Sequence, residues 1–383
     1  MTEALYLDNA ATTPVRREVL EAMWPYLTGE FGNPSSAHEL GERAARAMQS
    51  ARASIAEHLG CRPSEIVFTS GGTEADNLAV KGIALGHPRG RHLVTTPIEH
   101  EAVRESIDYL RRLHGFEVTE LAVDGDGLLV SGALERALRP DTTLVSIQHA
   151  NNEIGTVQPI RDLAEIARAA GVPFHTDAVQ SAGALDVGLT TLGVDAISIA
   201  GHKLGAPKGI GALAVRGSLV LEPLLHGGGQ ERGRRSGTEN VAGAVGLATA
   251  LALAADERAQ QARAIEARDA LIDGVLARVP GAVLTGSREH RLPGNASFCF
   301  PGTSGEAVLL ELESRGIVCS SGSACAAGSD EPSHVLLALG IAPEIAQTSV
   351  RFTLPSEMTL AQAHEVVERV VDAVTTVGGL RAG

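Results

Sequence analysis

Short apolar runs rich in β-branched residues alternate with longer helical stretches between residues 60 and 216. Several runs, such as Leu144–Ile147, are continuously apolar, as expected for strands that helices cover on both faces. The spacing of most runs leaves room for a crossover helix, which predicts an α/β fold with a mostly parallel seven-stranded sheet. The predicted strands are Ile66–Ser70, His92–Thr96, Phe116–Ala122, Thr142–His149, Val172–Asp177, Asp195–Ala200 and Gly211–Val215.

The last two predicted strands are separated only by the turn around Lys203, which is too short for a crossover. We therefore expect one of that pair to run antiparallel. Ahead of the sheet, Ser36 and Glu39 form a capping-box pattern for a helix that ends near Gly60.

After residue 255 the pattern changes, which suggests a second lobe in a chain too long for one average domain. We expect a large α/β domain over residues 13–255 and a smaller α+β domain over residues 1–12 and 256–383. The elements predicted in the second lobe are a charged amphipathic helix (Asp256–Ala277), two strand-like runs (Ala296–Phe300 and Gly316–Cys319) and a closing helix (Leu360–Val377).

Composition and charge narrow the possible functions. The 383-residue chain has a formal net charge of −14, which argues against a surface that binds nucleic acid or an anionic membrane. The most apolar helix candidate, Val241–Ala255, is too short to span a bilayer comfortably. The first residues lack a signal-peptide pattern and the four cysteines lack a disulfide-framework spacing, so we expect a cytoplasmic protein. The densest basic run, Arg232–Arg235, suits either a solvated loop or a contact with an anion or a subunit.

Lys203 is one of only three lysines in the chain, and it follows an apolar strand. An ammonium can lose its proton when it is desolvated and can then attack a carbonyl, whereas a guanidinium cannot. Burial at the end of a strand should lower the pKa of Lys203. Lys203 is therefore the first candidate for a Schiff base with pyridoxal phosphate.

Asp177 ends the strand before the one that leads to Lys203. A carboxylate at the end of a buried strand is costly without a cationic partner, and the protonated pyridine nitrogen of the cofactor would be such a partner. The alternative for Asp177 alone is the N-cap of a helix. Because ligands of such sheets collect at the carboxyl ends of strands, the pairing with Lys203 favours the cofactor.

Two glycine-containing turns are candidates for binding the cofactor phosphate. Gly72 and Thr73 begin a helix directly after the first predicted strand, where free N–H groups and a hydroxyl can bind an anion. Thr238 stands in a second such turn. Three further strand-end side chains suit the ring: His100 could stack on it and exchange protons, while Asn152 and Gln180 could bond its hydroxyl.

Cys325 lies among small residues in the stretch from Cys319 to Ser329. An accessible thiol in such a loop can deprotonate and act as a nucleophile. A metal site at Cys319 and Cys325 is the alternative, but their spacing is poor for zinc and no histidine is near, so we expect no metal. Cys61 and Cys299 are interpreted as structural.

Together these motifs resemble the group I cysteine desulfurases, the NifS/IscS-like branch of the class V aminotransferases, which have the pyridoxal-phosphate fold type I. The resemblance covers almost the whole chain, and its most specific element is Ser-Gly-Ser-Ala-Cys at 321–325. The matching motifs are Leu7–Pro14, Gly32–Ser36, Thr69–Glu74, Asn151–Gly155, Gly201–Lys203, Arg235–Asn240 and Ser321–Cys325.

The resemblance implies a mechanism. L-cysteine would displace Lys203 from the cofactor while Arg351, with Asn152, holds the substrate carboxylate. Lys203 would then remove the Cα proton, and the thiolate of Cys325 would attack the substrate sulfur, which leaves a Cys325 persulfide and L-alanine.

The resemblance also implies a cofactor contact from His202 and a homodimer in which Thr238 reaches the phosphate of the neighbouring subunit. Where relatives often carry a phosphate-binding serine, this chain has Ala200, and it ends at Gly383, about a helix short of longer members. The sulfur acceptor would be a protein such as an iron–sulfur scaffold or a tRNA-thiolation protein. The alternatives are a selenocysteine lyase, another class V enzyme such as an aminotransferase, or a non-catalytic partner that keeps the fold.

Overall fold

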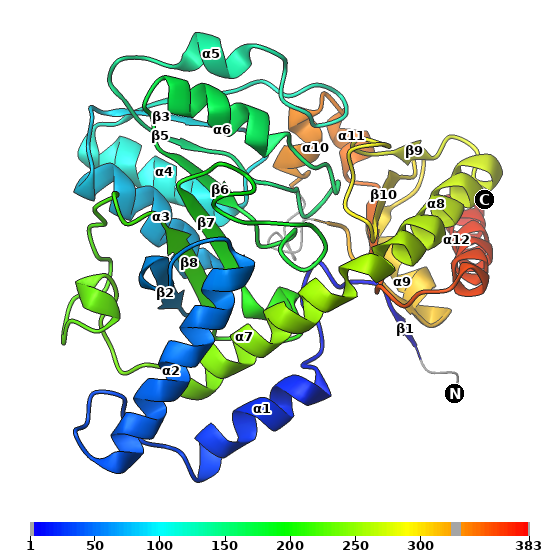
Figure 1. The fold of residues 1–383 in the computed structure, drawn as a ribbon. Coiled ribbons are helices and arrows are strands. Elements are labelled where there is room, and N and C mark those ends of the chain that lie inside the picture. Colours follow the sequence, from blue (N-terminus) through cyan, green and yellow to red (C-terminus); the bar gives the residue numbers. More distant parts are fainter. Residues whose placement is uncertain (1–3, 323–330, 382–383) are drawn as a thin grey trace.

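The computed structural model describes residues 4–322 and 331–381, and its largest element is a seven-stranded sheet (Figure 1). Its strand order is β2-β8-β7-β6-β5-β3-β4. The predicted α/β architecture with seven strands is confirmed, with each end within a few residues of its expected place. The strands are β2 (Ile66–Thr69), β3 (His92–Thr95), β4 (Glu117–Glu120), β5 (Thr142–Ser146), β6 (Phe174–Asp177), β7 (Ala196–Ala200) and β8 (Gly211–Val215).

Strand β8 is the antiparallel member, as the short turn after β7 predicted. It pairs antiparallel with both β2 and β7, whereas β7, β6, β5, β3 and β4 pair in parallel. Strand β2 therefore points the same way as β7. The carboxyl ends of six strands lie at one edge of the sheet.

Two layers of helices cover the sheet, because side chains of each central strand alternate between two apolar cores. In β2, Val67 packs with α3 and α4, while Ile66 and Phe68 pack on the opposite face with α1, α2, α5, α6 and α7. Figure 1 shows the sheet between these layers. The helices are α1 (Arg17–Thr28), α2 (Glu39–His58), α3 (Gly72–Gly86), α4 (Glu101–His114), α5 (Ala133–Ala137), α6 (Ile160–Ala169) and α7 (Val241–Asp256).

A second, smaller group of elements surrounds its own apolar core. Its antiparallel sheet has the order β12-β10-β9, and the N-terminal strand β1 pairs in parallel with β11. Strand β1 thus pairs with the C-terminal part of the chain, although the exact domain limits stay a prediction. The elements are β1 (Leu5–Tyr6), α8 (Gln261–Arg278), β9 (Val283–Leu284), β10 (Asn295–Cys299), α9 (Gly305–Ser314), β11 (Ile317–Val318), β12 (Ser349–Thr353) and α12 (Leu360–Arg381). Two short helices, α10 (His334–Ala338) and α11 (Pro343–Ala346), belong to a separate small cluster with Ile98, Ile154 and Cys299.

Two predicted helix boundaries were wrong. Helix α2 begins at Glu39 with His38 as its cap, because His38 Nδ1 accepts a hydrogen bond from the Gly41 N–H at 3.2 Å; Ser36 is not the cap. The helix expected over 256–277 is divided, since α7 continues to Asp256 and a 3₁₀ turn (Glu257–Gln260) precedes α8. Within the described residues, no helix combines the length and apolarity needed to cross a bilayer.

Candidate active site

The candidate residues gather where the parallel strands end. Helix α3 begins just after β2, His100 caps α4 after β3, and Asn152 follows β5. Asp177 is the last residue of β6, and Lys203 ends the 3₁₀ turn Gly201–Lys203 that follows β7. Because these strands point the same way, residues far apart in the sequence meet at one edge of the sheet.

Lys203 lies against the segment that follows β1. Its Nζ donates hydrogen bonds to the carbonyl oxygens of Ala11, at 2.8 Å, and of Ala10. Gln180 Nε2 donates to the same Ala10 oxygen at 3.0 Å. The N-terminal segment thus links two of the predicted cofactor-binding side chains, a role that the sequence pattern did not indicate.

Asp177 is buried, and its surroundings set its charge. Burial raises the pKa of the Asp177 carboxyl, while His100, the Val179 N–H and Lys203 lower it. Asp177 Oδ1 accepts the Val179 N–H at 2.8 Å. The residues after Asp177 form turns rather than a helix, so the alternative reading as a helix N-cap was wrong.

A buried polar layer lies beside Asp177 on the face of the sheet that α3 covers. His175 is fully buried, and its ring nitrogens bond Ser146 Oγ and Ser198 Oγ at 2.9 Å each. Burial lowers the pKa of His175 to about 3, so the ring is neutral. Asp76 of α3 has its Oδ1 3.7 Å from His175 Nε2.

Two buried acids in this layer were missed by the sequence reasoning. Burial raises the pKa of Asp76 well above its ordinary value, and the nearby charge of Asp177 adds to this effect. Burial also raises the pKa of Glu99 to about 8, although Glu99 accepts hydrogen bonds from Thr96 and Gln148. The sequence did contain a sign of the buried Asp76. It lies between Ala75 and Leu78 on the apolar side of the predicted helix, the side that α3 buries.

The first turn of α3 offers free N–H groups to an anion, because early helical N–H groups have no partner within the helix. Gly72 is needed there, since a Cβ would lie 2.7 Å from Val179 Cγ2. The same Cβ would lie 3.3 Å from the Cβ of Ala200, so side chains at position 200 point toward this turn. Thr73 is exposed beside it.

His202 lies next to Lys203, with Nδ1 3.2 Å from the Thr12 hydroxyl. Burial, with smaller contributions from the charges of Lys203 and Lys208, lowers the pKa of His202 to about 4. The imidazole is therefore neutral at physiological pH, and it can bind a phosphate as a hydrogen-bond donor without bringing a charge.

Arginines of the basic run at 232–235 form ion pairs and hydrogen bonds with other parts of the same chain. Arg235 pairs with Glu74 at 2.8 Å, and Arg234 donates to the Ser64 carbonyl at 2.9 Å. Just before the run, buried Glu231 pairs with Arg52 at 2.6 Å. These contacts hold the turn that carries Thr238, whose side chain is exposed in the single chain.

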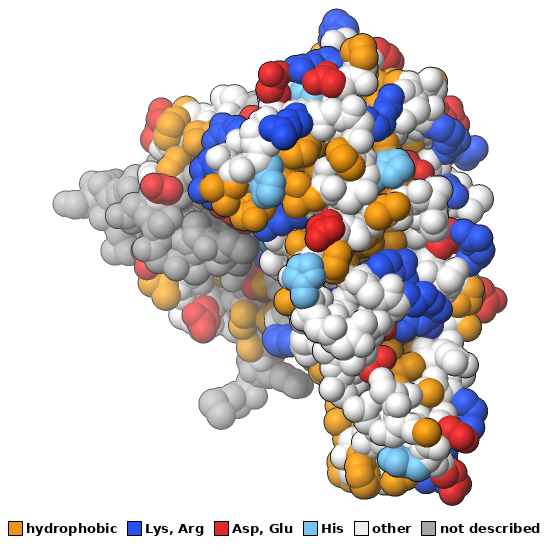
Figure 2. Space-filling model, turned by 90° about the vertical axis from the view of Figure 1, so that its left-hand side faces the viewer, with side chains coloured by type: hydrophobic (Ala, Val, Ile, Leu, Met, Phe, Trp, Pro, Cys, Tyr) orange, Lys and Arg blue, Asp and Glu red, His pale blue; other side chains and the backbone are white. Residues whose placement is uncertain are grey.

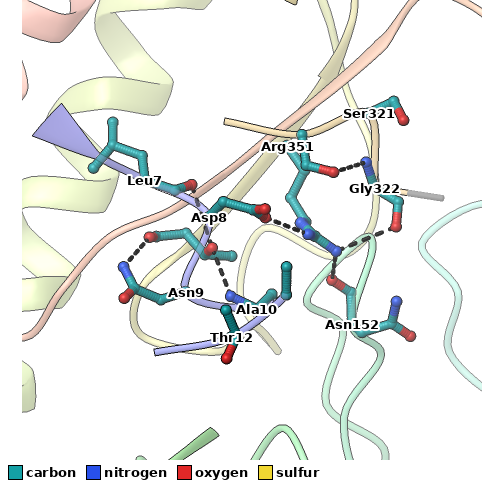
Figure 3. Close-up of polar contacts among 12 residues, drawn as sticks. Leu7, Asp8, Asn9, Ala10, Thr12, Asn152, Ser321, Gly322 and Arg351 are labelled. Atoms are coloured by element: carbon teal, nitrogen blue, oxygen red, sulfur yellow. Dashed lines mark hydrogen bonds and ion pairs between the residues drawn. The ribbon is translucent and has the colours of Figure 1, made fainter. Parts of the chain in front are cut away.

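Arg351 of β12 joins three chain segments (Figure 3). Its Nη2 pairs with Asp8 Oδ1 at 2.6 Å, and its Nη1 donates to the carbonyls of Asn152, at 2.8 Å, and Gly322, at 3.2 Å. Arg351 is 1% exposed, and its Nε has no hydrogen-bond partner among the described residues. The pairing with Asp8 was not predicted.

Cys325 lies outside the described residues. The described residues that flank Cys325 in the sequence are fixed by hydrogen bonds. Before it, the Gly322 carbonyl accepts a bond from Arg351, and after it, Ser333 Oγ donates to buried Glu153 at 2.6 Å. Burial raises the pKa values of the Cys61 and Cys319 thiols to about 12 and that of Cys299 to about 11. These three thiols are therefore poor nucleophiles.

Comparison with known proteins assigns a family. The profile of the family Aminotransferase class-V matches residues 5–366. The chain is 46% identical to "Cysteine desulfurase IscS" of Dictyoglomus turgidum over 382 residues, which cover 98% of this chain and 97% of that protein. It is 47% identical to a protein of the same name from Methanosarcina thermophila, over 97% of this chain and 92% of the relative.

Solved structures agree with these relatives. A structure described as a NifS-like protein superimposes with a TM-score of 0.90 at 38% identity, and the match covers 97% of this chain and all of the other. A structure described as SspA in complex with cysteine has a TM-score of 0.81 at 39% identity, over 92% of this chain and 99% of that one.

Proposed function

The chain belongs to the class-V aminotransferase family, and from that membership we propose how its site works as a pyridoxal-phosphate-dependent cysteine desulfurase. The enzyme converts L-cysteine to L-alanine and transfers the sulfur to one of its own cysteines. The observation that carries the proposal is the meeting of Asp177 with His100 and Lys203 at one edge of the sheet, where both lower the pKa of Asp177.

The residues present fit pyridoxal phosphate. Asp177 is a buried carboxyl suited to the pyridine nitrogen, and the amide of Gln180 suits the ring hydroxyl. The α3 turn at Gly72 and Thr73, together with neutral His202, offers uncharged donors to the phosphate. When bound, the cofactor supplies an electron sink that makes the Cα proton of the substrate acidic.

The remaining steps belong to the chain itself. Lys203 Nζ would hold the cofactor aldehyde, and it would then take the Cα proton of the substrate as a general base. His100, fixed as the cap of α4 through a 3.1 Å bond from the Ala102 N–H to Nδ1, faces Asp177 and exchanges protons near the ring. Arg351 and Asn152, which are joined by a hydrogen bond from Arg351 Nη1 to the Asn152 carbonyl, hold the substrate carboxylate.

Cys325 takes the sulfur. Its thiolate attacks the sulfur of L-cysteine, a new S–S bond forms, and the C–S bond of the substrate breaks. The carbon that loses sulfur gains a proton, so L-cysteine and the Cys325 thiol become L-alanine and a Cys325 persulfide. The persulfide then passes sulfur to an acceptor protein, either an iron–sulfur scaffold or a tRNA-thiolation protein.

We further propose a cytoplasmic homodimer with a large domain of residues 13–255 and a small domain formed by 1–12 and 256–383. Helix α1 and the residues after it expose four large apolar side chains, which a second copy would cover. These side chains are Leu20, Trp24, Leu27 and Phe31. The exposed Thr238 turn would reach the partner's phosphate site. Figure 2 shows acidic and basic side chains interspersed over the face it draws, which supports protein partners over nucleic acid.

One experiment tests the reaction. Purified protein is mixed with L-cysteine and a reductant, and alanine and sulfide are measured for the wild type and for Cys325→Ala. We expect equal amounts of both products from the wild type and neither from the variant, whose cofactor absorbance should be retained. Undiminished turnover in Cys325→Ala would contradict the persulfide step, and conversion of the cofactor to its amine form would indicate an aminotransferase.

A further inference from the structure

Arg351 is almost completely buried, and within residues 4–322 and 331–381 Asp8 is the carboxylate that pairs with it directly. Glu153 also faces Arg351, which lowers the pKa of the Glu153 carboxyl, but burial raises that pKa above its ordinary value. Glu153 is moreover bonded to Ser333 Oγ. Asp8 is therefore the counter-ion that keeps the guanidinium stable inside the protein.

Among the residues that the structure describes, the N–H donors of Arg351 are only partly used. An arginine has five N–H donors, and the bonds to Asp8, Asn152 and Gly322 use three of them. The buried Nε, which has no partner among the described residues, belongs to the same fork as Nη2, the nitrogen that Asp8 contacts. A carboxylate binds such a fork through two parallel bonds, so Asp8 and an incoming carboxylate compete for Nη2.

The backbone around Asp8 is fixed while its side chain can turn. The Leu7 carbonyl accepts the Thr353 N–H at 2.7 Å, and the Ala10 N–H donates to Thr353 Oγ1 at 2.9 Å (Figure 3). The Asp8 side chain is 17% exposed, so it can rotate toward water without moving this segment.

We propose that Asp8 is an internal counter-ion that occupies Arg351 until the carboxylate of L-cysteine replaces it, and that Asp8 thereby sets the affinity of the site for its substrate. The inference rests on the proposed role of Arg351 in binding the substrate carboxylate. Arg351 keeps one carboxylate partner in each state, so its charge is never buried alone. When Asp8 returns to Arg351, it also helps to displace the carboxylate of L-alanine.

The exchange occurs next to the reacting amine. The two residues that follow Asn9 provide the carbonyls that Lys203 Nζ contacts, and Gln180 donates to the first of them. Asp8 is thus a specificity-determining residue on a segment that connects the carboxylate-binding arginine to the cofactor-anchoring lysine.

The test measures the affinity of the cofactor-loaded enzyme for L-alanine, which carries the carboxylate and lacks the reactive thiol, by titration calorimetry. L-Alaninamide, which has no carboxylate, is the matched ligand control. Asp8→Asn keeps the size of the side chain and an oxygen acceptor but removes the charge. We expect it to bind L-alanine about tenfold tighter, as one partly buried charge pair would give, with no change for L-alaninamide.

Further variants separate charge from loosening of the segment. Asn9→Ala removes the bond from Asn9 Nδ2 to the Thr353 carbonyl, 2.7 Å long, without changing charge, and it should not tighten L-alanine binding. If Asp8→Asn folds poorly, Asp8→Ser can replace it in the experiment. Asp8→Ser is also uncharged and should likewise tighten the binding of L-alanine. In turnover, the KM for L-cysteine should fall in both Asp8 variants, and kcat should not rise.

Unchanged or weaker binding of L-alanine in both Asp8 variants would overturn the inference, as would equal tightening in Asn9→Ala. Arg351→Gln tests the premise separately, because it should abolish the preference for L-alanine over L-alaninamide. If Arg351→Gln keeps that preference, the proposed role of Arg351 in binding the substrate carboxylate is wrong. If Arg351→Gln loses the preference but the Asp8 variants do not bind L-alanine more tightly, only the proposed role of Asp8 is wrong.

Discussion

The side-chain amine of Lys203 donates a hydrogen bond to the backbone carbonyl of Ala11, with Nζ and O 2.8 Å apart. The N-terminal segment is therefore part of the site, although Ala11 and Lys203 are 192 residues apart in the sequence. These backbone carbonyls hold Nζ in place. Once the ammonium has lost its proton, the amine can attack a cofactor aldehyde.

Replacement of Lys203 tests the cofactor anchor. Lys203→Ala should lose the yellow absorbance of the cofactor-bound enzyme, and Lys203→Arg should lose it as well, because a guanidinium stays protonated and cannot attack the aldehyde. Absorbance spectra after loading with pyridoxal phosphate measure this. Lys208→Ala is the control that should keep the absorbance. A yellow Lys203→Arg enzyme would contradict the assignment.

Ala200→Ser should tighten cofactor binding. The Cβ at position 200 points toward the start of α3, so a hydroxyl there can donate to the phosphate. One added hydrogen bond is worth about 1 kcal/mol, or roughly fivefold in affinity. Spectral titration of the apoprotein measures the change. Ala200→Val, which adds bulk without a donor, should weaken binding, and equal affinities in all three proteins would place the phosphate elsewhere.

Asp76→Asn should make the apoprotein more stable at neutral and high pH. Burial raises the pKa of Asp76 in the folded state, so the folded protein keeps a proton that the unfolded chain releases once the pH exceeds the ordinary pKa of about 4. Each pKa unit of that rise lowers the free energy of unfolding by about 1.4 kcal/mol, and this loss of stability grows as the pH rises toward the pKa of the folded state. The groups that face Asp76 are Asp177, Glu99, Ser198 and neutral His175.

Urea unfolding of the apoprotein at pH 5 and pH 8 measures this effect. The stability gained by Asp76→Asn should be larger at pH 8. A variant that is destabilised by the same amount at both pH values would show that Asp76 is ionised in the folded protein.

Arg52→Met should destabilise the protein strongly. Arg52 and Glu231 form a buried pair, and removal of the guanidinium leaves the Glu231 carboxylate buried without its partner. Breaking such a pair costs about 3–5 kcal/mol. The matched control is Arg17→Met, since Arg17 and Glu21 form an exposed pair, for which we expect a change below about 0.5 kcal/mol. Thermal unfolding measures the stability of both variants. Similar losses of stability would mean that burial does not increase the contribution of the Arg52–Glu231 pair.

Local patterns in the sequence predicted the strands of the large sheet well. Continuous apolar runs such as Leu144–Ile147 can be buried on both faces only as central strands, and the short turn at Lys203 required an antiparallel neighbour. The same patterns placed Asp177 and Lys203 at strand ends, which identified the chemistry. The boundaries of α2 and α8 were less accurate, because a histidine cap and a 3₁₀ turn have no strong local signature.

The sequence by itself determined the fold class, which follows from local periodicity. It also provided the candidate reactive side chains, from residue type at strand ends and from the family resemblance. Only the tertiary structure decided which charges meet. Asp8 and Arg351 are 343 residues apart, and Asp76 on helix α3 lies near Asp177 at the end of strand β6. Such pairs depend on how Asp8, just after β1, bridges to Thr353 of β12 and on how α3 packs on the large sheet. Burial at those contacts then sets the charge of each group, because desolvation depends on neighbours that no local pattern specifies.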